Sequence, residues 1–402
     1  MEKDSVWRSS LIYLFSRLIS KVINMSINNK QTIARSEPKF YSFIAVSTIA
    51  IVALYFAGVP THYISWFSFF LAALSVAGND AIQTIGTFIE SKKDTPLLPK
   101  IIVFCGLLYL VHLYAWYSDG GQIHFDRLKK IEYNPEYNLI QLIAPIILLI
   151  ITRLKAPIST TFLILSLFST KTDVIAGMLS KSLIGYGVSF VSAFILWGVL
   201  AKFSPKEYEE EHEPDPKSEK IWSFLQWIST ASLWVSWMLQ DTANIAVYIP
   251  RQLSFIEFFV GMTIMAGALV YILADNGGRI QEIVNEKSDI NTAKAATIID
   301  FIYAIILFVF KTISNLPMST TWVFLGLLAG REIILHIVTT KDLPYMETFR
   351  KVGKDIFLAT VGIIVSLAIY YVGLIFYPVK KKATIRFEAP HKIEVSYQKL
   401  HI

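Results

Sequence analysis

The sequence predicts an all-α, polytopic membrane protein with inverted repeats and re-entrant or broken helices. The first observation is composition: of the 402 residues, 54% are hydrophobic and only 17% are charged, against roughly 25% charged in an average soluble domain. The second is that apolar residues gather in stretches of about 15 to 23, close to the length that an α-helix needs to cross a bilayer. The third is an internal repeat of polar motifs. Together they exclude a soluble globular core, a disordered chain and a disulfide scaffold.

Nine apolar stretches are candidates for membrane helices, and shorter or more polar apolar pieces follow some of them. Basic residues flank the membrane region on both sides. This favours two cytoplasmic termini and therefore an even number of crossings. The nine stretches are 41–58, 62–78, 101–117, 138–152, 182–200, 221–238, 254–274, 295–315 and 355–377, and the shorter pieces lie near 81–90, 156–168 and 319–337.

The polar segments divide the chain into five parts. Residues 1–40 carry seven basic and three acidic side chains, with apolar residues at helical spacing. They predict an amphipathic helix on the membrane surface, with a solvated leader as the alternative. Residues 202–220 hold seven acids, four bases and three prolines and predict a hydrophilic linker. It separates a first membrane repeat with an extra leading span (41–201) from a second (221–378). A basic tail follows (379–402).

Several classes of function find no support in the sequence. The net charge of the chain is +6, and in a membrane protein such a basic excess usually lies in cytoplasmic loops. No run of basic residues alternates with aromatic residues, as it would in a nucleic-acid site. The seven histidines have no metal-ligand spacing, and the lone Cys105 has no partner. Nucleotide-binding and nucleophile motifs are not found either. We therefore expect neither an enzyme nor a resident cofactor.

Two motifs recur in the same order in the two halves. Pro-Ile-Ser-Thr-Thr at 157–161 is repeated as Pro-Met-Ser-Thr-Thr at 317–321, an offset of 160 residues. Upstream of each motif lies an aspartate in a polar interruption, Asp80 in one half and Asp241 in the other, at an offset of 161. Such symmetry in a membrane protein points to a transporter whose substrate is held near the midplane between the repeats. A channel with duplicated halves is the alternative. We favour inverted repeats, because broken helices at corresponding positions are typical of them.

The two aspartates predict a cation site. An ionised carboxylate at membrane depth costs about 3 kcal/mol or more, so each needs a partner or a wet cavity. Amide side chains accompany both, and oxygen ligands of this kind suit a hard cation such as sodium. The alternative is that these residues only cap short helices. The predicted sodium ligands are Asn79, Asp80, Gln83, Gln240, Asp241 and Asn244.

The Pro-x-Ser-Thr-Thr motifs predict helix starts, because proline suits the first turn and hydroxyl groups accept hydrogen bonds from its free N–H groups. A helix N-terminus that faces a cavity binds anions. A Ser/Thr-rich kink packed against a neighbouring helix is the alternative. The predicted anion ligands are Ser159, Thr160, Thr161, Ser319, Thr320 and Thr321.

An anion site beside two carboxylates needs a further component. Cations bound between the anion and the carboxylates would offset their mutual repulsion and give cation-coupled symport. Alternatively, the anion itself could carry a proton, which favours phosphate over sulfate. Asp300 and Glu257 are further acids near apolar stretches, and for each an ion path or a structural pair with a base stays open.

With these motifs the chain resembles the inorganic phosphate transporter (PiT) family of sodium- or proton-coupled carriers. That family has a Gly-x-Asn-Asp-x-x-Asn motif in each half and Pro-x-Ser-Thr-Thr after it. Residues 77–80 and 240–244 are similar to the two copies of the first motif, and the resemblance runs from about 62 to 376. It implies an inverted-repeat transporter with re-entrant segments at a phosphate and cation site. The resemblance also implies that Thr87, in the Gly86-Thr87 pair that follows the first copy, is a phosphate ligand.

Two glutamines depart from the family pattern. Gln83 and Gln240 stand where the family has asparagine, and the extra methylene moves a ligand oxygen by about 1 Å, enough to alter ion choice or coupling. We therefore expect a multi-pass cell-membrane protein that carries inorganic phosphate together with sodium. Proton coupling, sulfate as the substrate and an anion channel are the alternatives. The expected partners are phosphate, sodium and lipid, with a homodimer left open and no nucleic acid.

Overall fold

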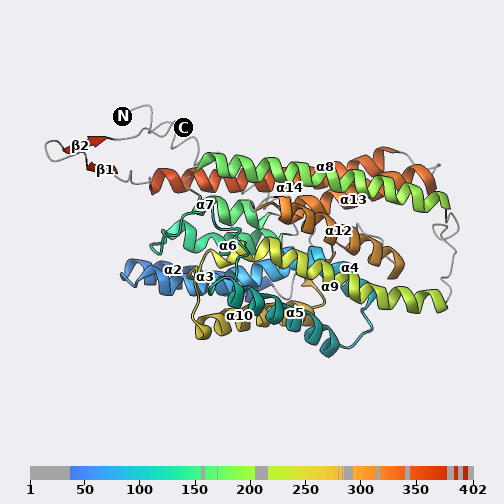
Figure 1. Cartoon of the computed structure of the whole chain (residues 1–402), viewed down its shortest axis with the longest axis horizontal. Helices are drawn as coiled ribbons and strands as arrows, with labels where there is room; N and C mark the ends of the chain where they lie inside the picture. Colours follow the sequence, from blue (N-terminus) through green and yellow to red (C-terminus); the bar gives the residue numbers. More distant parts are fainter. Residues whose placement is uncertain are drawn as a thin grey trace.

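The computed structural model describes residues 37–154, 159–169, 171–203, 216–278, 280–282, 284, 293–313, 317–339 and 345–377, together with two short strands. Within these ranges long helices lie side by side in a bundle (Figure 1). The amphipathic helix predicted for 1–40 lies almost entirely outside the described residues, as do most of the linker predicted for 202–220 and most of the tail. Those expectations stay predictions, and so do the boundaries of the five parts.

The first half of the bundle holds α2 (Glu37–Phe56), α3 (Thr61–Val76), the π-helical turn η1 (Ala77–Ala81), α4 (Ile82–Ser91), α5 (Leu97–Ser118), α6 (Leu139–Arg153), the π-helical turn η2 (Thr161–Leu165), α7 (Ser166–Phe168) and α8 (Thr172–Phe203). The second half holds α9 (Pro216–Ala246), α10 (Phe255–Ala274), α12 (Ala293–Ile313), α13 (Thr320–Thr339) and α14 (Tyr345–Phe376). In the tail, β1 (Thr384–Phe387) pairs antiparallel with β2 (Ile393–Ser396). Apart from this small hairpin, the described elements are helical, as the sequence predicts.

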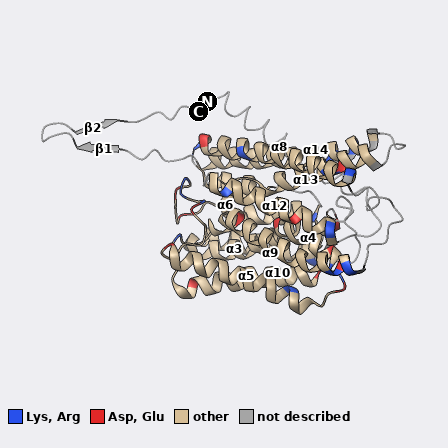
Figure 2. Ribbon diagram, turned by 45° about the vertical axis from the view of Figure 1, so that its right-hand side comes forward, with Lys and Arg blue, Asp and Glu red and all other residues tan. Residues whose placement is uncertain are grey.

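Seven helices in the described part of the chain are long and apolar enough to cross a membrane, namely α2, α5, α8, α10, α12, α13 and α14. Most charged residues lie toward the ends of the bundle (Figure 2). The prediction of a polytopic membrane protein is therefore confirmed. Two helices begin ten residues before the apolar stretches that predicted them, α8 at Thr172 and α14 at Tyr345.

Contacts between helix ends define two opposite ends of the bundle. At the first, which we call the Tyr137 end, the Tyr137 hydroxyl donates to the carbonyl of Val247 (3.4 Å), just after α9, and its backbone N–H donates to Thr61 at the start of α3 (3.0 Å). At the second, the Lys92 end, the Lys92 ammonium donates to Ser223 near the start of α9. The path through α3 and α4 therefore runs from the Tyr137 end to the Lys92 end, and α9 runs back.

The remaining helices repeat this reversal. In the first half α5 returns to the Tyr137 end, α6 and α7 form a hairpin that enters and leaves there, and α8 leaves toward the Lys92 end (Figure 1). In the second half each of these directions is opposite, and the hairpin of α12 and α13 enters from the Lys92 end. Inverted repeats with re-entrant hairpins are thereby confirmed.

The two aspartates differ in their local backbone. Asp80 lies in η1, a π-helical turn inside a continuous helix from α3 to α4, and such π-bulges often occur at functional sites. Asp241 lies inside α9, which stays α-helical until Ala246. The expectation of two matched helix breaks is therefore wrong for the second aspartate.

Both Pro-x-Ser-Thr-Thr motifs precede a helical segment, as predicted. The Ser159 hydroxyl accepts a hydrogen bond from the N–H of Phe162 (3.3 Å), and the Ser319 hydroxyl accepts one from Trp322 (3.4 Å). These are the contacts of N-terminal caps, which satisfy N–H groups that the first helical turn leaves free. The serines therefore fix the tips of the two hairpins.

Helix α13 lies very close to α8 along two glycines. A Cβ atom on Gly326 would lie 2.4 Å from the carbonyl oxygen of Tyr186, and one on Gly330 would lie 2.2 Å from that of Phe190. Two glycines four residues apart share one helix face and permit this close approach, as is common between membrane helices. The glycine face thus joins a helix of the first half to the hairpin of the second.

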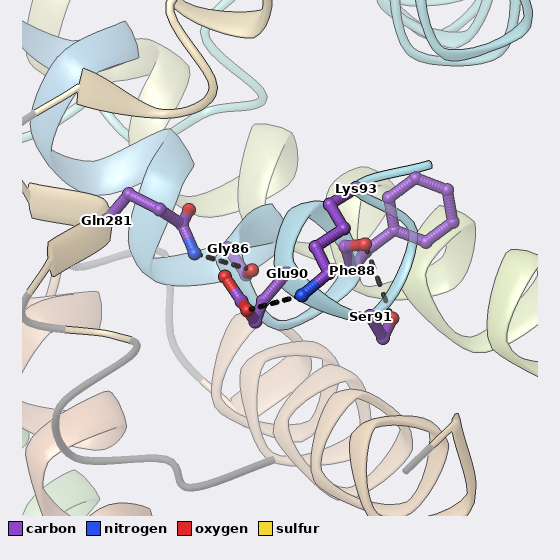
Figure 3. A network of polar contacts seen from close by, with 6 residues as sticks. All are labelled: Gly86, Phe88, Glu90, Ser91, Lys93 and Gln281. Carbon is purple, nitrogen blue, oxygen red and sulfur yellow. Dashed lines mark hydrogen bonds and ion pairs between the residues drawn. The ribbon is translucent and has the colours of Figure 1, made fainter. Parts of the chain in front are cut away.

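A segment that follows α10 packs against α4 in the same way. The Gln281 amide donates to the carbonyl oxygen of Gly86 (2.9 Å), where a side chain would meet Gln281 at 3.0 Å. Figure 3 shows this contact beside the Glu90–Lys93 ion pair (4.0 Å) of the next turn. The second half therefore fixes the orientation of α4.

Candidate functional site

Four polar segments meet in the interior of the bundle: η1 with the start of α4, the last turns of α9, and the tips of the two hairpins. The two aspartates lie within electrostatic range of one another, and their side chains are 2% and 1% exposed. These are the segments that the sequence analysis predicted to converge.

Asp80 is surrounded by amide and hydroxyl groups. The Asn79 amide donates to its carboxylate (2.8 Å), and Gln83 donates in turn to the Asn79 oxygen (3.1 Å). The Thr321 hydroxyl also interacts with the Asp80 carboxylate, and Thr160 lies nearby with its hydroxyl buried. Because Asn79 belongs to the first half and Thr321 to the second, this carboxylate contacts both halves of the molecule.

Asp241 has a matching set of neighbours. Thr320 donates its hydroxyl proton to the Asp241 carboxylate, and the Asn244 amide donates to the same carboxylate (3.0 Å). The Thr161 hydroxyl of the first hairpin lies 3.3 Å from the Asn244 oxygen and 3.2 Å from the carbonyl of Met318.

The threonines therefore follow a crossed pattern. The first threonine of each motif, Thr160 or Thr320, lies near the aspartate of its own half, and Thr320 donates to it. The second threonine, Thr161 or Thr321, reaches the aspartate site of the other half. A ligand between the hairpin tips would thus contact oxygen atoms of both repeats. This arrangement is expected of a binding site at an inverted-repeat interface.

Two predicted ligands lie elsewhere. The Gln240 amide donates to the carbonyl of Leu307 (2.6 Å), so this side chain braces α9 against α12. The Thr87 hydroxyl donates to Asp300 (2.7 Å), which also accepts a hydrogen bond from Thr230. Asp300 is thus bonded to two hydroxyls rather than paired with a base, and it forms a second buried cluster that has no equivalent in the repeat.

Other side chains near the site support the structure. Glu257 belongs to the N-terminal cap of α10, where its carboxylate accepts a hydrogen bond from the N–H of Ser254 (2.8 Å), so it has a structural role. The Ser319 N–H donates to Ser182 of α8 (2.8 Å), and Tyr303 donates to the carbonyl of Thr320 (2.8 Å). These two contacts hold the tip of the second hairpin, and the repeat alone gave no signal for either.

One basic side chain near Asp241 was missed by the sequence analysis. Arg127, in the segment between α5 and α6, is 1% exposed and donates from its Nε to the carbonyl of Leu239 (3.2 Å). Its charge interacts with that of Asp241. Its position depends on how residues 119–138 fold, and no periodicity in the sequence indicates this.

The comparisons with known proteins concern mainly the fold. No family model matches the sequence, and the comparison with curated proteins gives no match. Among solved structures, the chain is similar to one described as the sodium-dependent phosphate transporter. The TM-score is 0.52 and the identity 15%, over 77% of this chain and 98% of that chain. The chain has the fold of that transporter. This confirms, at the level of the fold, the resemblance to the phosphate transporter family. It also confirms the expectation of a multi-pass membrane protein.

Proposed function

We propose that this chain is a secondary active transporter of the cell membrane that carries inorganic phosphate together with sodium. The observation that carries the proposal is the crossed pattern, in which Thr321 of the second hairpin reaches Asp80 and Thr161 of the first hairpin donates to Asn244 beside Asp241. Carboxylate, amide and hydroxyl oxygens suit a hard cation. The hydroxyl groups can instead donate to an anion when cations occupy the carboxylates. The solved structure of similar fold is named for sodium and phosphate, which supports this pair of solutes.

Sodium coupling is tested by uptake of radiolabelled phosphate into proteoliposomes that contain the purified protein. We expect an inward sodium gradient to drive phosphate above its equilibrium level, because binding of the anion requires cations at the two carboxylates. A proton gradient without sodium should leave uptake at background. Accumulation driven by protons alone would instead favour proton-coupled transport, and anion current without either gradient would favour a channel. Competition by unlabelled sulfate shows whether the site prefers phosphate or sulfate.

The crossed threonines give a second prediction. Thr321→Val keeps the shape of the side chain and removes the hydroxyl that reaches Asp80. We expect a loss of about 1.5–3 kcal/mol of site stabilisation, as for other hydrogen bonds to charged groups, or roughly a 10- to 150-fold drop in phosphate uptake at low substrate. Thr312→Val is the matched control, because its hydroxyl only donates to the carbonyl of Val309 at an exposed position. Equal uptake by both variants would contradict the crossed site.

A further inference from the structure

Asp300 lies where three helices meet, and it takes no part in the site between the hairpin tips. Its two carboxylate oxygens accept hydrogen bonds from hydroxyl groups of two other helices, one from Thr87 of α4 (2.7 Å) and one from Thr230 of α9. Asp300 itself belongs to α12 and is 0% exposed. The residues 160 and 161 positions before it are Ile140 and Leu139. The cluster is therefore an addition to the duplicated polar motifs.

The negative charge of this cluster is not balanced by a base. In the part of the chain that the structure describes, no basic side chain forms an ion pair with Asp300. Helix α12 is apolar enough to cross a membrane, and an ionised carboxylate in such a helix costs about 3 kcal/mol or more. Each threonine hydroxyl donates its only proton and keeps lone pairs. The cluster thus offers oxygen ligands and one uncompensated negative charge.

A second pair of polar side chains joins α4 to α9 one turn closer to the Lys92 end. Gln226 precedes Thr230 by four residues and Ser91 follows Thr87 by four, so each lies on the same helix face as its neighbour. Gln226 is 0% exposed, and its amide nitrogen donates to Ser91 (2.5 Å). Its side-chain oxygen has no hydrogen-bond partner among the described residues. A buried acceptor without a donor is unfavourable, and a cation would satisfy it.

Polar side chains continue along α4 in both directions from these two pairs. At the Lys92 end, the ammonium of Lys92 donates to Ser223 of α9. Toward the hairpin tips, Gln83 lies one turn before Thr87 and donates to Asn79, the neighbour of the first aspartate (3.1 Å). A column of polar groups therefore follows α4 from the Lys92 end to the aspartate site of the first half, and the Asp300 cluster lies within it.

We propose that Asp300, Thr87 and Thr230 form a sodium site that is separate from the two aspartates at the hairpin tips. This inference rests on the proposed function and adds a further site for the coupling cation. Carboxylate and hydroxyl oxygens are ligands that suit a hard cation, and bound sodium offsets the charge of Asp300. Because the cluster lies between the Lys92 end and Asp80, it holds a cation on the path to the main site.

The test measures binding of sodium-22 to the purified protein without phosphate, and the sodium dependence of phosphate uptake. We expect Asp300→Asn to bind one sodium ion fewer per chain at the concentration that saturates the wild type, and to need at least tenfold more sodium for half-maximal uptake. Its KM for phosphate, at the sodium concentration that saturates each protein, should change less than twofold. Thr230→Val should raise the sodium requirement at least threefold.

Thr297→Val is the matched control. Thr297 is buried one turn earlier on α12, and its hydroxyl donates only to the backbone carbonyls of Ala293 (2.7 Å) and Trp222 (3.2 Å). This variant should bind as much sodium as the wild type and show the same sodium dependence of uptake.

Unchanged sodium binding by Asp300→Asn refutes the site. A lower unfolding midpoint would then show that Asp300 only joins the three helices, and an altered pH dependence of uptake would show that it carries a proton instead. If Asp300→Asn is not monodisperse in size-exclusion chromatography, Thr230→Val decides, and sodium binding equal to that of Thr297→Val refutes the proposal. A wild type that binds sodium at this cluster but does not accumulate phosphate removes the proposed function and leaves the site standing. A wild type that binds no sodium removes both.

Discussion

Replacing Asp80 with asparagine should abolish sodium-driven phosphate uptake, and Asp241→Asn should do the same. Each substitution keeps the size of the side chain and removes the charge that a coupling cation needs. Loss of one partner of a buried, hydrogen-bonded charge pair costs about 2–5 kcal/mol, which corresponds to a roughly 30- to 4,000-fold loss of uptake at limiting sodium. The measurement is initial uptake of radiolabelled phosphate into proteoliposomes at several sodium concentrations.

The same variants should fold normally. Asp80 and Asp241 lie within electrostatic range of one another in the interior, so removal of one charge relieves repulsion as well as a desolvation cost. We expect the midpoint of thermal unfolding in detergent to stay the same or to rise. Asp119→Asn is the control, because Asp119 is exposed and its carboxylate accepts only a local hydrogen bond from Ser118 (3.2 Å). Full sodium-dependent uptake by both site variants would remove the cation-site argument.

Replacing Gly330 with leucine should prevent the bundle from forming correctly. The first atom of the new side chain would lie 2.2 Å from the carbonyl oxygen of Phe190 and 3.1 Å from the Cβ of Ala193. These are atoms of the packed backbone of α8 and of a side chain too short to turn away, so the helices must separate. Overpacking usually costs about 1–3 kcal/mol and sometimes more, and here the obstruction begins at the first carbon.

The expected result for Gly330→Leu is a low yield of monodisperse protein, measured by fluorescence-detected size-exclusion chromatography, and a lower unfolding midpoint of what remains. Gly187→Leu is the matched control. It lies on α8 itself, where nothing is found within 4 Å of the added carbon, and a leucine in a helix is favoured over glycine. Equal yield and stability for the two variants would contradict the close contact between α8 and α13.

The architecture could be predicted from the sequence because it depends on patterns along the chain. Apolar stretches identify membrane helices, and the repeated Ser-Thr-Thr motifs, with an aspartate before each, identify two related halves. Serine after proline predicts a helix cap, and Ser159 and Ser319 both have the expected contact. These features need only local chemistry and spacing.

The remaining features depend on packing between distant segments. The sequence around Gln240 is similar to that around Asn79, but the Gln240 amide finds the carbonyl of Leu307 on another helix. Thr87 lies next to the predicted site in sequence, yet its hydroxyl donates to Asp300 of α12. Arg127 comes from an irregular segment whose course has no sequence signature. The spacing of residues along the chain therefore does not predict the direction of these side chains or the path of this segment.

The glycine face between α8 and α13 also limits how the molecule can change shape. Because the two helices touch backbone to backbone, the second hairpin cannot slide along α8 without steric conflict. We therefore expect the two to move as one unit, although they come from opposite halves of the chain. For the proposed transport cycle, we therefore expect the binding site to open along a different seam, so that the units that move are not the two sequence repeats.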